Sequence, residues 1–225
     1  MRALEGEGLL QAWERSRGRS VPRAALAILE LAESGKTFED LSILPLADRN
    51  LSLLEARALS FGPGMQVYAN CPDCGSALEF ELDGRDLSMS IRSAAALPGQ
   101  GRPADTSDLL ACLEAGDPAR GRAILLERTL GWETAAREPP AELLERFDEL
   151  NESAEIRLQA SCEGCGGNPV VDLDLAGFVL KEVARAARDL LTQVHILAGS
   201  YGWSEDRILE MGTARRSAYL GLLAA

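Results

Sequence analysis

The sequence predicts an α+β protein that is mainly helical and contains two small β-hairpins. Three observations indicate this class. Apolar residues recur at helical spacing over most of the 225 residues, strict alternation marks two short segments, and each of those segments contains a C-x-x-C-G motif. We expect one integrated domain, made of a helical region (1–62), a first hairpin (63–92), a helical insert (93–153), a second hairpin (154–175) and a C-terminal helical region (176–225).

The N-terminal region carries signals that begin and end helices. The segment VPRAALAILELA predicts a helix that Gly35 stops, and Thr37 can cap the turn that follows. The run LADRNLSLLEARALSFG predicts a longer helix with Leu59 on its apolar face. The letters SGKT around Gly35 resemble the end of a phosphate-binding loop, but Glu30 occupies the position of the first glycine and a helix precedes it, so we interpret Gly35 as a helix stop.

Two segments share the pattern strand, C-x-x-C-G turn, strand. In MQVYANCPDCGSALEFELDG, apolar and polar residues alternate on both sides of the motif, and IRLQASCEGCGGNPVVDLDL repeats this pattern as far as Leu175. The likeness suggests that the two hairpins pair side by side and arose by internal duplication.

The remaining chain is predicted to be mostly helical. Leu87, Met89 and Ile91 alternate, which predicts a further strand, and the Gly/Pro-rich segment 95–105 is expected to be an exposed loop. Helices are predicted in SDLLACLEAG, DPARGRAILLERTLG and PPAELLERFDELNE, and one long helix is predicted from Ala176. Ser204 is then expected to cap a short helix, and RRSAYLGLL, which begins at Arg215, closes the C-terminal helical region.

Four cysteines, Cys71, Cys74, Cys162 and Cys165, lie in the two motifs. A C-x-x-C-G turn presents two thiolates on one side, and two such turns complete the four-sulfur tetrahedron that zinc prefers. The long insert does not oppose this pairing, because closure entropy grows only with the logarithm of loop length. The sequence therefore predicts a structural zinc site in a zinc-ribbon-like centre.

Three other interpretations of these cysteines stay open. A redox C-x-x-C usually begins a helix, whereas strands flank both motifs here. A nucleic-acid-binding ribbon would carry basic and aromatic residues, whereas Asp73, Glu79, Glu81 and Glu163 surround these turns. The cysteines could also be core residues without a metal. The fifth cysteine, Cys112, lies in an apolar helical run and is interpreted as a small core residue.

No active site is expected. The one histidine, His195, lies in the long helix, where we expect it to be partly buried and hydrogen-bonded rather than a general base, and no isolated carboxylate pair stands out. The formal net charge of −12 disfavours nucleic acid and anionic lipid as partners. With no apolar run long enough to cross a bilayer and no signal-peptide pattern, we expect the chain in the cytoplasm of the cell that makes it.

The order of features resembles one protein family. The segments PLADRNLSLLEARALSFGPGMQVYANCPDCG and VHILAGSYGWSEDRILEMGTARRSAYL are similar to baseplate hub assembly proteins of T-even-type contractile phages, and still more to their relatives encoded with phage-tail-like contractile injection systems. The likeness covers most of the chain. The insert departs from it, because its Gly/Pro loop is longer.

This resemblance implies a non-enzymatic function. Such proteins act as assembly chaperones or minor components of the baseplate hub, and hub or spike proteins would be the partners. Whether the protein remains in the assembled particle stays open. The candidate partner surface lies in the C-terminal segment and comprises Tyr201, Trp203, Ile208, Arg215, Arg216 and Tyr219.

Overall fold

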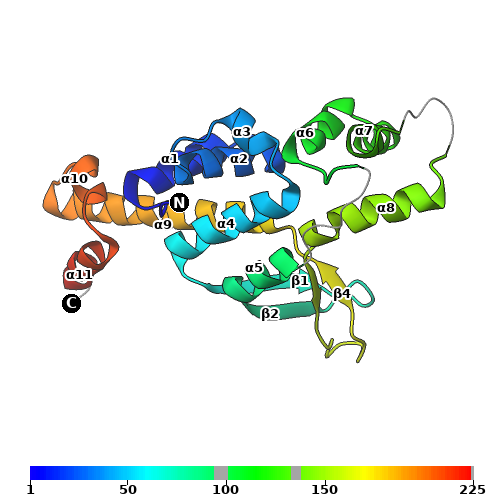
Figure 1. The fold of residues 1–225 in the computed structure, drawn as a ribbon. Coiled ribbons are helices and arrows are strands. Elements are labelled where there is room, and N and C mark those ends of the chain that lie inside the picture. Colours follow the sequence, from blue (N-terminus) through cyan, green and yellow to red (C-terminus); the bar gives the residue numbers. More distant parts are fainter. Residues whose placement is uncertain (94–100, 133–137, 224–225) are drawn as a thin grey trace.

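The computed structural model describes residues 1–93, 101–132 and 138–223. Its helices form an elongated layer, and the two hairpins lie together on one side of this layer (Figure 1). The structure confirms the mainly helical α+β class. The helices are α1 (Gly6–Ser16), α2 (Val21–Ala32), α3 (Phe38–Ser42), α4 (Leu46–Phe61), α5 (Gly84–Ser93), α6 (Thr106–Ala115), α7 (Pro118–Leu130), α8 (Ala141–Asn151), the 3-10 turn η1 (Glu152–Ala154), α9 (Leu175–Tyr201), α10 (Glu205–Leu209) and α11 (Thr213–Leu223). The strands are β1 (Gly64–Asn70), β2 (Ala77–Asp83), β3 (Arg157–Gln159) and β4 (Val170–Asp172).

The core lies between α2 and the long helix α9. Leu26, Ile28 and Leu29 of α2 are fully buried. Val183 and Leu197, on the apolar face of α9, are also fully buried. Helices α1, α4, α10 and α11 also pack against α9. Because successive buried residues of α9 are three or four positions apart from Ala176 onwards, one face of this helix supports both terminal regions.

Local signals begin and end the helices as expected. Thr37 caps α3 in a capping box, since its hydroxyl accepts from the Asp40 amide while the Asp40 carboxylate accepts from the Thr37 amide. Ser204 caps α10 by accepting from the Arg207 amide. Gly35 lies just beyond the end of α2 with φ +93°, a conformation that only glycine adopts readily, so its role as a helix stop is confirmed.

The strand predicted at Leu87, Met89 and Ile91 is wrong, because these residues lie in α5. Residues four apart lie on one face of either a strand or a helix, so the alternation did not distinguish the two. The burial does: Ile91 is 4% exposed and Leu87 is partly buried, whereas Met89 is 61% exposed. The segment folds back onto α4 and β2 as a helix.

The loop expected to be exposed at 95–105 is buried at its end. Residues 94–100 lie outside the described part, but Ala104 and Asp105 are 2% and 6% exposed. Ala104 accepts a hydrogen bond from the Leu46 amide, and Asp105 caps α6. Behind them the fully buried Asp108 binds two arginines, and this ion pairing lowers its pKa despite the opposing effect of burial.

Helix α4 buries polar residues that the apolar pattern did not predict. Leu59, expected on its apolar face, is 50% exposed, whereas Arg49 and Arg57 are buried. Arg49 donates to the side chain of Asn50, which in turn donates to the Ala154 carbonyl, and burial lowers the pKa of Arg49 to about 10. Their hydrogen bonds explain why these polar groups are tolerated in the interior.

Arg57 joins three elements. Its guanidinium binds both carboxylate oxygens of Glu182 on α9, at 2.8 and 3.0 Å, and donates to the carbonyls of Gly62 and Gly64 at the start of β1. Its side chain is 3% exposed and that of Glu182 is 15% exposed. Such a bidentate, almost fully buried pair fixes the base of the first hairpin on α9.

The two hairpins share a register but form separate sheets. β1 pairs with β2 and β3 pairs with β4, both antiparallel, and no ladder joins the two pairs among the described strands. The prediction that they pair side by side is therefore wrong for their backbones. Leu175, expected to continue the last strand, is the first residue of α9, because Asp174 caps the helix by accepting from the Gly177 amide.

In the described part of the chain, no helix combines the length and the apolar character needed to cross a bilayer.

The Arg57 contact generates a first prediction. Arg57→Gln should lower the free energy of unfolding by about 3 kcal/mol, because it leaves the Glu182 carboxylate and two carbonyls without their partner. Arg85→Gln is the control, since the side chain of Arg85 is 74% exposed and should contribute less than about 0.5 kcal/mol. Urea unfolding of both variants measures the difference, and equal losses would contradict the role given to Arg57.

Candidate metal centre

The first C-x-x-C-G motif forms a tight turn at the end of the β1–β2 hairpin. The Cys71 amide donates to the Ser76 carbonyl and the Gly75 amide donates to the Cys71 carbonyl, both at 2.8 Å. Gly75 has φ +77°, which a residue with a side chain adopts at a cost. The turn therefore needs this glycine, and it places the sulfurs of Cys71 and Cys74 on the same side.

The second motif repeats these contacts at equivalent positions. The Cys162 amide donates to the Gly167 carbonyl and the Gly166 amide donates to the Cys162 carbonyl, again at 2.8 Å, and Gly166 has φ +73°. The matching register extends into the strands, where Leu158 faces Val171 as Val67 faces Phe80. The two hairpins therefore have the same local structure at their turns and in the adjoining strand pairs.

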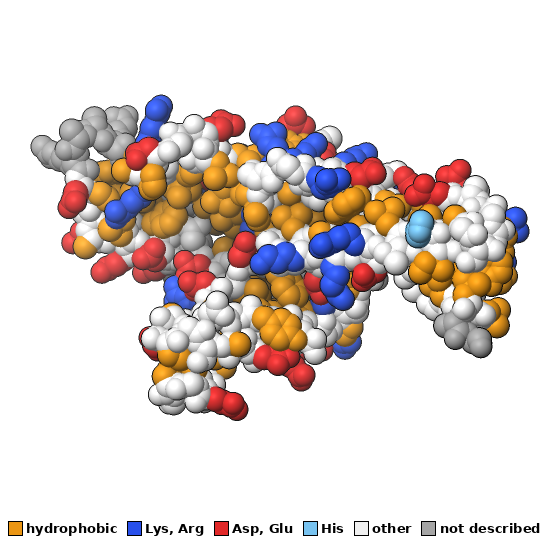
Figure 2. Space-filling view, turned by 180° about the vertical axis from the view of Figure 1, so that it is seen from behind, with side chains coloured by type: hydrophobic (Ala, Val, Ile, Leu, Met, Phe, Trp, Pro, Cys, Tyr) orange, Lys and Arg blue, Asp and Glu red, His pale blue; other side chains and the backbone are white. Residues whose placement is uncertain are grey.

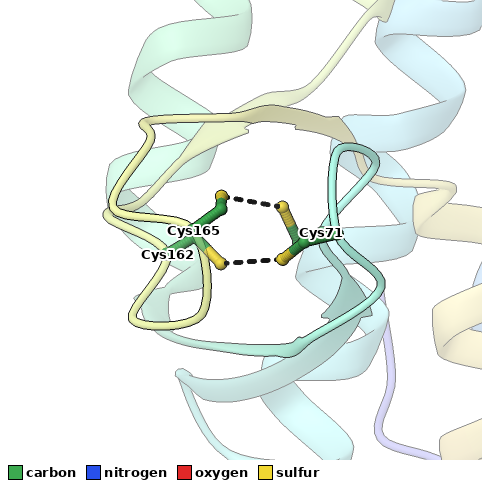
Figure 3. Close-up of side chains that lie close together, drawn as sticks. Cys71, Cys162 and Cys165 are labelled. Carbon is green, nitrogen blue, oxygen red and sulfur yellow. Dashed lines mark hydrogen bonds between the residues drawn. The ribbon is translucent and has the colours of Figure 1, made fainter.

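The four sulfur atoms lie within 4.8 Å of one another (Figure 3). Cys71 Sγ is 3.9 Å from Cys165 Sγ, and Cys74 Sγ is 3.6 Å from Cys162 Sγ, so each contact joins one motif to the other. These separations far exceed a disulfide bond of roughly 2.05 Å, and all four cysteines are free. They agree with the edge of roughly 3.8 Å expected for a tetrahedron with metal–sulfur bonds of about 2.3 Å.

The pKa values of the thiols differ within the cluster. Burial raises the pKa of Cys71. The pKa of Cys74 is lowered to about 6, because the side chain and the amide of Ser76 can donate hydrogen bonds to its thiolate form. For Cys165 the Gly167 amide acts in the lowering direction, but the neighbouring sulfurs, led by Cys162, outweigh it and raise its pKa to about 12. Four adjacent thiolates repel one another, so a bound cation is what would hold all four deprotonated.

Close packing of the two turns leaves no room for a side chain at Gly164. A Cβ at this position would lie 2.1 Å from Ser76 Oγ, 2.9 Å from Ser76 Cβ and 3.3 Å from Cys74 Sγ. The backbone of Gly164 does not have a positive φ, so the requirement for glycine comes from the approach of the first turn. Gly164 and Ser76 are site residues that the sequence did not reveal, because contacts between distant segments leave no local signal.

The structure brings together the four cysteines predicted as metal ligands and leaves the other candidates apart. Cys112 is half-buried rather than in the core, its thiol donates to the Gly121 carbonyl at 3.2 Å, and burial raises its pKa. His195 is exposed on α9, contrary to the expectation of a partly buried residue (Figure 2). Among the described residues, the cysteine cluster is the one group suited to hold a metal ion.

The aromatic residues of the candidate partner surface form one cluster at the C-terminal end of the helical layer. Tyr201 stacks on Trp203 with ring centroids 4.6 Å apart, and Tyr219 meets both rings edge-on at 5.6 and 4.8 Å. All three rings are partly exposed. The exposed Arg215 lies over Tyr219 at 5.8 Å.

Two other members of that candidate surface face inward. Ile208 is fully buried, and Arg216 is 5% exposed, where it donates to the Met211 carbonyl and to the side chain of Gln193 at 3.1 Å. In this conformation they hold α10 and α11 on α9, so only the rings and Arg215 are available to a partner.

Comparison of the chain with protein-family models, with curated proteins and with solved structures found no match. The class of protein is therefore defined by fold and site alone: a mainly helical α+β protein in which two C-x-x-C hairpins form a four-cysteine cluster able to bind a metal ion.

The packing at Gly164 generates a second prediction. Gly164→Ala should weaken the binding of Co²⁺, a spectroscopic probe of tetrahedral thiolate sites, by about tenfold or more, because the added methyl group pushes the turns apart. Gly167→Ala in the same turn is the control, since its Cβ would lie 3.5 Å from Cys165 Sγ, an ordinary contact. Titration followed by thiolate-to-cobalt absorption gives both affinities. Similar affinities would show that the turns do not pack this closely.

Proposed function

We propose that the four cysteines bind one zinc ion in a structural site. The sulfur separations and the four-thiolate donor set support zinc, since soft thiolates in a tetrahedron select zinc or an iron–sulfur cluster, and one ion fits sulfurs less than 4.8 Å apart. With four protein ligands the ion has no open position for a substrate. The site would therefore stabilise the contact between the two hairpins and take no part in a reaction.

The function that follows is non-enzymatic assembly of the baseplate hub of a phage-tail-like contractile injection system. The resemblance of the α4–β1 segment and of the C-terminal segment to hub assembly proteins supports it. The observation that carries the proposal is the four-cysteine cluster, because a metal ion bound there would link the two hairpins and leave no open position for a substrate. Hub or spike proteins would be the partners, bound in part through the Tyr201, Trp203 and Tyr219 cluster, since exposed aromatic and arginine side chains are enriched at interfaces.

A thiol-redox function is the second candidate. It is favoured by the exposed Cys74, whose pKa is lowered to about 6, because a partly exposed thiolate is the reactive form of cysteine. The structural site is favoured over it because each motif lies between strands and the two sulfur contacts, Cys71 with Cys165 and Cys74 with Cys162, each join one motif to the other.

A third prediction separates these two candidates. Purified protein should contain close to one zinc ion per chain by elemental analysis. Cys74→Ser should lose the metal and lower the midpoint of thermal unfolding, because apparent metal-binding free energies of about 10 kcal/mol contribute to folding. Cys112→Ser, outside the cluster, should keep both. A metal-free protein with two readily formed disulfides would establish the redox function instead.

A fourth prediction concerns the partner. The full chain should co-purify with a hub or spike protein produced from the same gene cluster. Arg215→Glu should reduce the amount recovered about tenfold, because it reverses an exposed charge beside the aromatic cluster. Arg120→Glu, equally exposed on α7, should have no effect. Failure of every sheath, tube, hub and spike protein to bind would reject the assembly function while leaving the zinc site intact.

A further inference from the structure

We propose that the groove between the two hairpins binds an extended segment of a partner protein as a β-strand inserted between β1 and β4. The groove has a volume of about 1420 Å³. One wall is β1 from Gly64 to Ala69, the opposite wall is the end of the second hairpin from Val171 to Asp174, and the first turns of α9 form the floor. In the view from behind, the hairpins lie below the helical layer, and hydrophobic and basic side chains are exposed where the hairpins join this layer (Figure 2).

The free edge of β1 faces this groove with unpaired backbone groups. The Cys71 amide bonds to Ser76 and the Gly84 amide bonds to Pro63, so odd-numbered residues of β1 form the hydrogen-bonded pairs with β2. The amide and carbonyl of Gln66 and Tyr68 consequently point away from β2. In the described part of the chain these groups have no backbone partner, which is the arrangement that an added strand recognises.

The free edge of β4 presents the complementary wall. The Leu173 amide bonds to the Ile156 carbonyl, so Leu173 belongs to the hydrogen-bonded pairs with β3. Asp172 therefore directs its amide and carbonyl away from β3, and it lines the groove. Isolated two-stranded hairpins are marginal, and a strand bonded to both edges would join them into one five-stranded sheet.

Two clamps keep the edges apart and ready for an incoming strand. At one end the Arg57–Glu182 ion pair holds the base of β1 on α9, and both residues line the groove. At the other end, the zinc ion proposed for the cysteine cluster would tie the two turns together. Because β1 would then be held at both ends, a bound segment would lose little free energy to reorganisation of the protein.

The side chains of the groove select the chemistry of the segment. Phe61, Phe178 and Leu180 are partly buried and apolar on the helical side. Beside them Lys181 and Arg185 are exposed and form no ion pair among the described residues. The segment should carry apolar residues at alternate positions on its inner face, with an acidic residue opposite these two cations.

The outer face has the opposite charge. Glu81 of β2 and Asp172 of β4 line the groove and are exposed. Their negative charges disfavour acidic residues on the outer face of the segment. The inference rests on the proposed zinc site for the clamp at the two turns, and it holds for whichever particle or complex the partner belongs to.

The test begins with peptides. A random library of seven-residue peptides, the length of β1, is selected on the zinc-loaded full chain, and the consensus peptide is synthesised for calorimetry. We expect alternating apolar residues with an inner acidic residue. N-methylation of alternate amides should weaken binding at least about tenfold for both the odd and the even set, because each set bonds to a different edge. Sensitivity of one set alone, or of neither, overturns the insertion between β1 and β4.

Protein variants then place the peptide. Lys181→Glu combined with Arg185→Glu should weaken the consensus peptide about five- to tenfold and restore binding to a peptide with lysine at the inner position. Arg188→Glu, also exposed on α9 but outside the groove, should leave the affinity unchanged. A self-associating chain in sedimentation, with dimers that exclude the peptide, would identify a second copy as the occupant and overturn the proposal.

Discussion

The sulfur atoms of four cysteines from two distant turns lie within 4.8 Å of one another, with Cys74 and Cys162 88 positions apart in the sequence, and the surrounding hairpins and helices make this contact possible. Each turn is positioned by a hairpin of the same register, and each hairpin is rooted in a helix of the central layer: β1 follows α4, and β4 leads directly into α9. The insert contains α6, α7 and α8, of which α6 and α7 have side-chain caps, and Asp108 forms ion pairs within it, so it can fold between the two hairpins without disturbing their approach.

A second constraint acts at the opposite end of the hairpins. Arg57 is buried because Glu182 and two backbone carbonyls satisfy its guanidinium, and removing any one of these partners would leave a costly unpaired group in the interior. The cysteine cluster and this ion pair lie at the two ends of one structure. The ion pair fixes the base of the first hairpin, and a zinc ion bound at the cluster would fix its turn, so the proposed site would hold the β1 wall of the groove at both ends.

Outside the cysteine cluster, the surface carries two features that a partner could contact. The one histidine is exposed and outside the cluster, and among the described residues no second metal-binding group accompanies the cysteines. What the surface offers instead is an aromatic cluster at the end of α9 and an open groove beside its beginning. The proposed zinc ion would act on the groove indirectly, since it would fix one of its walls.

The sequence by itself determined the helices with clear caps, the two hairpins and the four cysteines, because these depend on neighbours within a few residues and on a motif with strict spacing. The tertiary structure alone decided the rest. Leu87 and Ile91 lie on one face of a helix, although their spacing of four positions fits a strand equally well. Arg57 rather than Leu59 is buried because its partner Glu182, 125 positions further along the chain, lies beside it in the fold. The separation of the two sheets, the glycine at 164 and the groove likewise come from contacts between distant segments, which no local pattern encodes.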